Sequence, residues 1–200
     1  MALAFSPNLH TVGQYMSKPV IYLFGGSNGA GKTTFARAYL PTAGVNLRFL
    51  NADEIARGLS PFSPETIALK AGRLMLQEVR GCIAARQSFG MESTLSGKTY
   101  IGILADAKQA GYEIELHYVW LMSADMAVQR VRQRVKKGGH PVPESDIRRR
   151  YQRSIDHFIG DYLPLADRWF IWDNRSANSI LLANSENDDK LKATEILCPT

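Results

Sequence analysis

The chain has 200 residues, of which 45% are hydrophobic and 22% are charged, a balance close to that of an average soluble globular protein. This composition argues against the fibrous and the intrinsically disordered classes. A chain of this length can bury one sizeable core, so we expect a single domain over residues 1–200 that begins with an extension over residues 1–18. Lys and Arg outnumber Asp and Glu by 24 to 19, and the resulting positive surface favours anionic ligands such as nucleotides.

Cysteine usage and hydropathy indicate the compartment. Cys82 and Cys198 are far apart in the sequence and have no CxxC partner or histidine cluster nearby, which argues against a disulfide framework or a zinc site. The N-terminus has no basic segment leading into an apolar stretch, and no run reaches membrane-spanning length. We therefore expect a cytoplasmic protein that makes no contact with a membrane.

In chain order, the predicted elements alternate between strand and helix. The apolar run at residues 19–25 is typical of a strand buried on both faces, and helical spacing follows from Lys32 up to Pro41. The remaining strands are expected at residues 47–50, 88–91, 112–121 and 168–172. The remaining helices are expected at residues 67–86, 98–110, 125–137 and 145–158. This alternation predicts an α/β fold of the P-loop NTPase or kinase type, with a mainly parallel central sheet flanked by helices.

Two segments interrupt this pattern. Residues 136–144 read Lys-Lys-Gly-Gly-His-Pro-Val-Pro-Glu, a break between two basic helices, and we expect them to form a small mobile lid. Residues 184–192 are polar and charged, so we expect a loop or a loosely attached end there, within a polar C-terminal end over residues 184–200.

One segment carries a strong signal for nucleotide binding. Residues 26–33 match G-x-x-x-x-G-K-[ST] between a predicted strand and a predicted helix. In such a loop the backbone N–H groups surround the phosphates, Lys32 meets the β- and γ-phosphates, and Thr33 holds Mg²⁺ through its hydroxyl. The residues expected to bind the nucleotide are Gly26, Ser27, Asn28, Gly29, Ala30, Gly31, Lys32, Thr33 and Thr34. The motif predicts binding of ATP or GTP with Mg²⁺, but it does not choose between a kinase, a GTPase and a mechanical ATPase.

Two acidic residues follow predicted strands at the edge where the P-loop also lies. Asp53 is placed to accept the proton of a substrate hydroxyl, or alternatively it only caps the helix that follows. Glu92 is placed to bind a substrate hydroxyl or Mg²⁺, with Thr94 beside it. The alternative is that Thr94 or Ser96 caps the next helix. Because the carboxyl ends of parallel strands share one edge of a sheet, these side chains are expected to meet.

A basic segment extends over the two helices on either side of the expected lid. Arg130 and Arg134 share one helix face, so both can point at one phosphate chain and neutralise charge in the transition state. The other basic residues are expected to form a solvated cationic surface. They are Arg132, Lys136, Lys137, Arg148, Arg149, Arg150 and Arg153.

Taken together, the P-loop, Asn51-Ala52-Asp53, Met91-Glu92-Ser93-Thr94 and the Arg-rich segment up to Pro143 resemble the zeta-toxin-like kinases over residues 20–174. The resemblance implies that ATP or GTP phosphorylates a sugar hydroxyl of UDP-N-acetylglucosamine, and that an antitoxin protein is a partner. It also implies that Lys32 is the P-loop lysine, Asp53 the catalytic base and Glu92 a substrate-site carboxylate. Better-known members carry a second arginine near residues 139–143, where this chain has none. His140 or one of Arg148, Arg149 and Arg150 replaces it, or the acceptor differs.

We therefore expect a kinase that phosphorylates a small hydroxyl-bearing molecule. The expected catalytic residues are Lys32, Asp53, Arg130 and Arg134, and the expected substrate-binding residues are Asp53, Glu92, Thr94 and His140. The alternative is a nucleic-acid-associated or regulatory NTPase that hydrolyses ATP without a small-molecule acceptor. Nucleic acid is the less favoured partner, because no aromatic-interleaved recognition motif accompanies the charges.

Overall fold

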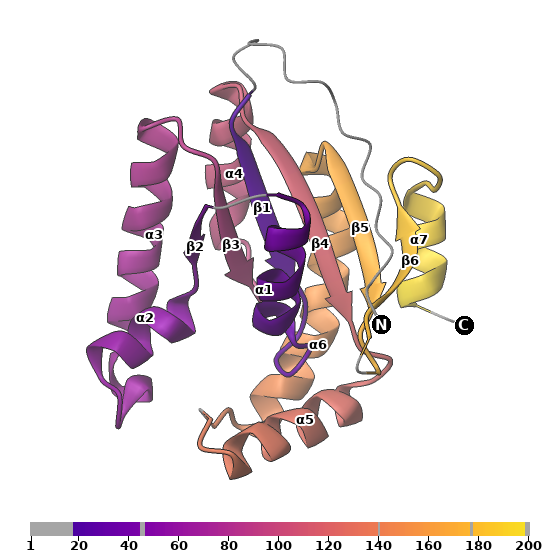
Figure 1. Cartoon of the computed structure of the whole chain (residues 1–200). Coiled ribbons are helices and arrows are strands. Elements are labelled where there is room, and N and C mark those ends of the chain that lie inside the picture. The colour runs from indigo at the N-terminus through magenta and orange to yellow at the C-terminus, as the bar shows by residue number, and fades with distance from the viewer. Residues whose placement is uncertain (1–17, 45–46, 140, 177, 199–200) are drawn as a thin grey trace.

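The computed structural model describes residues 18–44, 47–139, 141–176 and 178–198 (Figure 1). Its centre is a six-stranded sheet in the order β2-β3-β1-β4-β5-β6. The strands are β1 (Val20–Gly25), β2 (Arg48–Leu50), β3 (Phe89–Ser93), β4 (Glu113–Trp120), β5 (Arg168–Asp173) and β6 (Ile180–Asn184). The pairs from β2 to β5 are parallel, and β6 runs antiparallel to β5. This confirms the α/β fold with a mainly parallel sheet.

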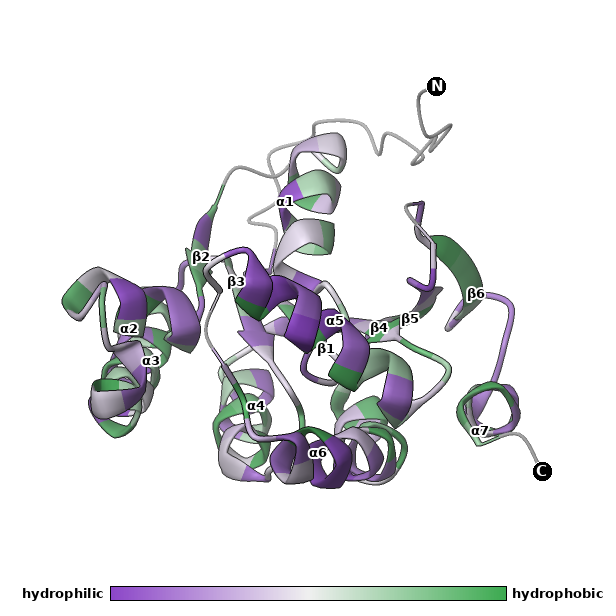
Figure 2. Cartoon of the chain, turned by 90° about the horizontal axis from the view of Figure 1, so that it is seen from below, coloured by the Kyte–Doolittle hydropathy of each residue, from purple (hydrophilic) through white to green (hydrophobic). Residues whose placement is uncertain are grey.

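Helices cover both faces of the sheet. They are α1 (Lys32–Thr42), α2 (Ala52–Leu59), α3 (Ala68–Ala84), α4 (Thr99–Gln109), α5 (Ala124–Lys136), α6 (Glu144–His157) and α7 (Lys190–Leu197). Seen along the strands, α1 lies on one side of the sheet and α4 and α6 on the other, with α5 across the edge where the parallel strands end (Figure 2). Short turns of other helix types occupy Pro64–Ile67, Phe158–Tyr162 and Leu163–Leu165. No helix in the described ranges has the length and apolar character needed to cross a bilayer.

The core has two parts, one on each face of the sheet. On the first face, Ile21 and Leu23 of β1 pack with buried side chains such as Met75 of α3 and Phe158 after α6. On the opposite face, Phe24 packs with residues of α1 and α5. Because β1 is buried on both sides, it tolerates the continuous apolar run seen in its sequence. The strand therefore fixes the position at which the P-loop begins.

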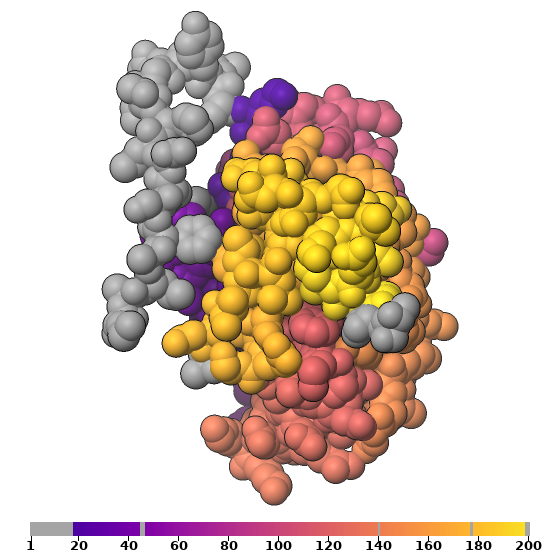
Figure 3. Space-filling view, turned by 90° about the vertical axis from the view of Figure 1, so that its right-hand side faces the viewer, coloured from indigo at the N-terminus to yellow at the C-terminus, as the bar shows by residue number. Residues whose placement is uncertain are grey.

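In the C-terminal region, residues 185–189 form the expected turn, but a strand and a helix that were not predicted lie on either side of it. Residues 180–184 form β6, and α7 follows with Ala193 and Leu197 buried in the core. The side chain of Asp189 caps α7 by accepting a hydrogen bond from the Lys192 backbone at 2.9 Å. Figure 3 shows this C-terminal segment packed closely on the body of the protein. This segment is therefore not loosely attached, because a few buried side chains anchor the helix that follows the polar turn.

The face of the sheet beneath α1 contains a buried polar network. His117 is fully buried, with Trp172 donating to its Nδ1 at 3.1 Å and its Nε2 lying 2.8 Å from Glu115. Tyr39 of α1 also donates to Glu115, at 3.0 Å, and Arg168 bonds its other oxygen at 3.0 and 2.9 Å. Trp172 can only donate, so Nδ1 is the acceptor and Nε2 carries the proton. The network thus ties the P-loop helix to β4 and β5.

Charges in this network are fixed by its surroundings. Burial between the rings of Phe24 and Phe170 lowers the pKa of His117 below 6.5, so the imidazole is neutral. Burial opposes the charge of Glu115, but the hydrogen bond from His117 and the charge of Arg168 together hold its pKa below the ordinary value. A charged, fully hydrogen-bonded carboxylate is therefore part of the folded core.

Removal of this carboxylate is expected to destabilise the fold. Glu115→Ala leaves the buried His117 N–H and the Tyr39 hydroxyl without their acceptor, so we expect a loss of about 3 kcal/mol in the free energy of unfolding. Urea denaturation at neutral pH measures it. The matched control is Glu113→Ala on the same strand, because Glu113 pairs with Arg168 at 3.7 Å near the surface. That change should cost less than about 1 kcal/mol, and equal losses would contradict the assignment.

Candidate active site

The P-loop connects β1 to α1 and has a backbone that suits glycine. Gly26 has φ 140° and Gly31 has φ 90°, which are conformations that residues with a Cβ rarely adopt. A Cβ on Gly26 would lie 2.3 Å from the Val119 carbonyl oxygen, and one on Gly31 would lie 2.6 Å from the Asn174 amide nitrogen. Asn174 also donates to the Ala30 oxygen at 2.6 Å, so the loop after β5 supports the P-loop from outside. The glycines and Asn174 thus fix the conformation of the loop.

Lys32 and Thr33 lie next to Glu92 at the end of β3. The Thr33 hydroxyl donates to Glu92 Oε2 at 2.6 Å, and the Lys32 ammonium lies 3.6 Å from Glu92 Oε1. Lys32 also donates to the Ser27 carbonyl oxygen at 3.1 Å. The register explains this closeness, because Phe24 of β1 is paired with Glu92 on β3. Glu92 is therefore the carboxylate that joins these two P-loop side chains.

Asn51 links this cluster to α2. Its side-chain nitrogen donates to Glu92 Oε2 at 2.9 Å, while its oxygen accepts from the backbone of Asp53 at 2.8 Å and of Glu54 at 3.3 Å. Asn51 is thus the N-cap of α2, and the alternative in which Asp53 caps the helix is wrong. In the described part of the chain the Asp53 carboxylate makes no hydrogen bond or ion pair, which leaves it available to a ligand.

Thr94 follows Glu92 and does not cap the next helix. Its hydroxyl lies 2.8 Å from that of Ser96, and α4 begins after Lys98 without a side-chain cap. The capping alternative for these hydroxyls is therefore wrong as well.

A cleft of about 520 Å³ contains most of the predicted site residues. The predicted site residues that line this cleft are Asn28, Gly29, Gly31, Lys32, Thr33, Thr34, Asp53, Glu92, Thr94, Arg130 and Arg134. Ala30 is instead fully buried in the core, and Gly26 and Ser27 contribute to the loop behind the wall. His140 lies outside the described residues, so its predicted role in substrate binding stays a prediction.

Three further side chains that were not predicted for the site also line the cleft. Tyr100 at the start of α4, Arg37 of α1 and Arg57 of α2 line it. Burial raises the pKa of the Tyr100 hydroxyl, which therefore remains a neutral hydrogen-bonding group. Arg37 and Arg57 follow Thr33 and Asp53 by one helical turn, so helical spacing could have indicated them, whereas no local pattern marks Tyr100.

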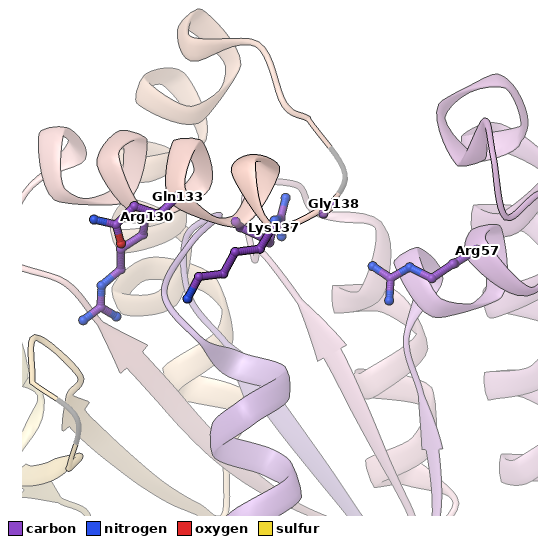
Figure 4. A pocket seen from close by; sticks show the side chains of 7 residues that line it. Arg57, Arg130, Gln133, Lys137 and Gly138 are labelled. Carbon is purple, nitrogen blue, oxygen red and sulfur yellow. The ribbon is translucent and has the colours of Figure 1, made fainter.

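A second cavity of about 650 Å³ adjoins the cleft between α2 and the end of α5 (Figure 4). Arg57 approaches it from α2, and on the other side Arg130 extends from α5 and Lys137 from the residue that follows α5. Its walls share Arg57, Arg130 and Arg134 with the cleft. The two hollows therefore form a continuous, strongly cationic surface above the P-loop.

The arginines of the basic segment divide into paired and cleft-lining residues. Arg148 pairs with Asp125 at 2.7 Å and with Glu144 at 2.8 Å, and Arg149 pairs with Asp146 at 2.8 Å. Arg150 also lies 3.6 Å from Asp146 but lines the cleft. Of the three arginines considered as replacements for the second family arginine, only Arg150 is in the cleft wall.

The fold and the cleft define a nucleotide-binding protein of the P-loop class. The family described as zeta toxin matches residues 9–185, and the chain belongs to this family of P-loop kinases. An uncharacterized protein of Haemophilus influenzae is 33% identical over 135 residues, which are 68% of this chain and 93% of that protein.

Solved structures share the fold. One from the PezAT chromosomal toxin–antitoxin system of Streptococcus pneumoniae matches with a TM-score of 0.65 and 16% identity, over 91% of this chain and 79% of that chain. AvrRxo1-ORF1:-ORF2 with ATP matches with a TM-score of 0.59 and 21% identity, over 84% of this chain and 59% of that chain. At these identities the likeness establishes a common architecture.

Proposed function

We propose that this chain is a kinase that transfers the γ-phosphate of ATP or GTP to a hydroxyl group of a small molecule. The observation that carries the proposal is that one cleft is lined both by Lys32 and Thr33 of the P-loop and by Asp53, whose carboxylate has no partner among the described residues. A P-loop fixes the phosphates, and a carboxylate beside them can orient a hydroxyl in line for attack.

Each residue of the cleft has a proposed role in binding or in phosphoryl transfer. P-loop N–H groups and Lys32 hold the β- and γ-phosphates, and Asp53 accepts the proton of the acceptor hydroxyl. Arg150 of α6, together with Arg130 or Arg134 of α5, stabilises negative charge on the phosphoryl group during its transfer. Glu92 and Thr94 contact the acceptor, and the segment 136–144, which contains His140, closes as a lid that excludes water.

Mg²⁺ fits the side chains at the end of β3. This ion prefers oxygen ligands and takes only one or two from protein when phosphates supply the others. Thr33 Oγ1 and Glu92 Oε2 lie 2.6 Å apart, so two suitable oxygens are already together. We propose Thr33 as the ligand, with Glu92 holding its hydroxyl in place or joining it. Bound Mg²⁺ would neutralise charge on the β- and γ-phosphates.

Nucleic-acid binding has less support from the basic segment. Arg132, Arg148 and Arg149 are paired with acidic side chains of α5 and α6, so much of this positive surface is internally neutralised. A regulatory NTPase without an acceptor remains the second candidate. It is favoured only by the solvent-accessible cleft, in which water could take the place of the acceptor.

Family membership makes UDP-N-acetylglucosamine the first acceptor to test. The protein is incubated with ATP or GTP, Mg²⁺ and this nucleotide sugar beside a panel of other hydroxyl-bearing metabolites, and products are identified by mass spectrometry. Lys32→Ala is the inactive control. We expect a phosphorylated nucleotide sugar. Transfer to another metabolite would keep the kinase proposal and change the acceptor, whereas release of only ADP and free phosphate would favour the NTPase.

We also propose an antitoxin protein as partner, located with this chain in the cytoplasm. The support is the zeta toxin family and the similarity to a protein of the PezAT toxin–antitoxin system. The proposed effect of the partner is to block the nucleotide cleft.

Residues 1–200 are proposed to form one domain, since β6 and α7 complete the same sheet and core as β1.

A further inference from the structure

The loop between β3 and α4 reaches the cleft and is anchored in the core by a buried side chain. Leu95 has φ 54°, a conformation that is costly for a residue with a Cβ, and its side chain is fully buried. A Cβ on Gly25 would lie 2.3 Å from Leu95 Cδ1, so Leu95 packs directly against the last residue of β1. The loop that carries Thr94 is thereby interlocked with the strand that carries the P-loop.

Two side chains beyond α4 hold the carbonyl groups of this loop. His157, the last residue of α6, has its Nδ1 3.0 Å from the Leu95 oxygen. The hydroxyl of Tyr162 donates to the Gly97 oxygen at 2.7 Å. Tyr162 is almost fully buried and ends the π-helical turn that continues α6. A π-helical turn is rare and places side chains where a regular α-helix would not. We name His157 and Tyr162 the loop clasp.

The clasp connects two walls of the cleft. Arg150 lines the cleft from the same helix that ends at His157, while Thr94 and Tyr100 line it from either end of the clasped segment. Local hydrogen bonds already order the loop: Leu95 N donates to Ser93 Oγ at 3.1 Å. These bonds lie within the loop and do not connect it to α6. The clasp makes that connection and fixes the distance between the loop and the helix. Neither clasp residue lines the cleft, so both act through the loop.

We propose that His157 and Tyr162 are positioning residues for the phosphoryl acceptor: they hold the segment from Ser93 to Tyr100 so that Thr94 and Tyr100 stay in register with the P-loop. This inference rests on the proposed kinase function. Nucleotide binding depends on the P-loop itself, and the clasp should therefore affect the acceptor far more than ATP.

The test uses variants that remove one hydrogen bond each. Tyr162→Phe deletes only the hydroxyl. His157→Leu removes the donor, whereas His157→Asn keeps an amide N–H close to the position of Nδ1. Arg153→Ala, on the exposed side of α6, is the matched control because Arg153 lines neither cavity. Transfer from ATP to UDP-N-acetylglucosamine gives KM for both substrates, and a fluorescent ATP analogue gives nucleotide affinity.

We expect Tyr162→Phe and His157→Leu to lower kcat/KM for the acceptor on the order of tenfold or more, because small displacements of positioning groups are costly in rate. Nucleotide affinity should be unchanged, and His157→Asn should restore most of the activity. The proposal is overturned if acceptor and ATP parameters fall together, or if Asn and Leu at position 157 are equally impaired.

Hydrogen–deuterium exchange separates this inference from the kinase proposal. If the wild-type protein phosphorylates no acceptor, the kinase proposal fails by itself. The clasp is then judged from the backbone amides of Leu95 and Ser96, which should exchange faster in Tyr162→Phe and His157→Leu while the ATP analogue still binds. Unchanged exchange in both variants would refute the clasp.

Discussion

Replacement of Asp53 by Asn is expected to lower phosphoryl transfer by about 10²- to 10⁴-fold, because an amide cannot accept the proton of the acceptor hydroxyl. Affinity for ATP should remain nearly unchanged, since Asp53 lies on α2 rather than in the P-loop. The change keeps the backbone hydrogen bond to Asn51 that begins the helix. Initial rates at saturating ATP, together with titration of a fluorescent ATP analogue, measure both quantities.

Asp106→Asn is the matched control for this experiment. Asp106 is an exposed carboxylate on α4 that lines neither cavity, so the same chemical change there should leave turnover unaltered. Loss of one negative charge in the first turn of α2 should cost only about 0.3–1 kcal/mol of stability. Unchanged turnover of Asp53→Asn at equal stability would show that Asp53 is not the base.

Lys32→Ala is expected to lower turnover by about 10²- to 10³-fold or more, the effect of removing one donor from a charge that develops in the transition state. Nucleotide affinity should fall too, because the ammonium also meets the β- and γ-phosphates in the ground state. Lys32 also has a structural role, since it lies 3.6 Å from Glu92 and both side chains are largely buried in the wall of the cleft. Rates and ATP-analogue titration test this prediction.

A second variant separates the loss of catalysis from the loss of this pairing. In Lys32→Ala/Glu92→Gln the unpaired carboxylate is absent, so thermal stability should recover relative to Lys32→Ala, whereas turnover should not. Recovery of turnover in the double variant would mean that Lys32 acts mainly by neutralising Glu92. Thermal unfolding of the three proteins, run beside the rate measurements, distinguishes these outcomes.

Much of the nucleotide side of the site could be predicted because its information is local. Residues 26–33 are contiguous, and each fixed position has a requirement that the sequence meets without reference to the rest of the chain. The apolar run before Gly26 likewise predicted a central strand, which β1 is. Residues at the ends of strands were also predictable, since parallel strands bring their carboxyl ends to one edge.

Other features followed no local rule. Asn51 was recognised only as part of a motif, yet its amide both caps α2 and binds Glu92, which is 41 positions away. The C-terminal strand and helix were missed because they are anchored by Ala183 of β6 and by Ala193 and Leu197 of α7 in a core built by distant residues. The polar composition of the C-terminal segment does not indicate such contacts.

The sequence by itself determined that this protein has a P-loop and a mainly parallel sheet, because these depend on short, contiguous patterns of glycine, lysine and apolar residues. Only the tertiary structure decided which residues form the proposed acceptor side of the cleft. It selected Arg150 among three adjacent arginines and joined His157 and Tyr162 to a loop about 60 positions earlier. The reason is physical: pairing of β1 with β3 and packing of α6 on the sheet bring together residues that no sequence spacing relates.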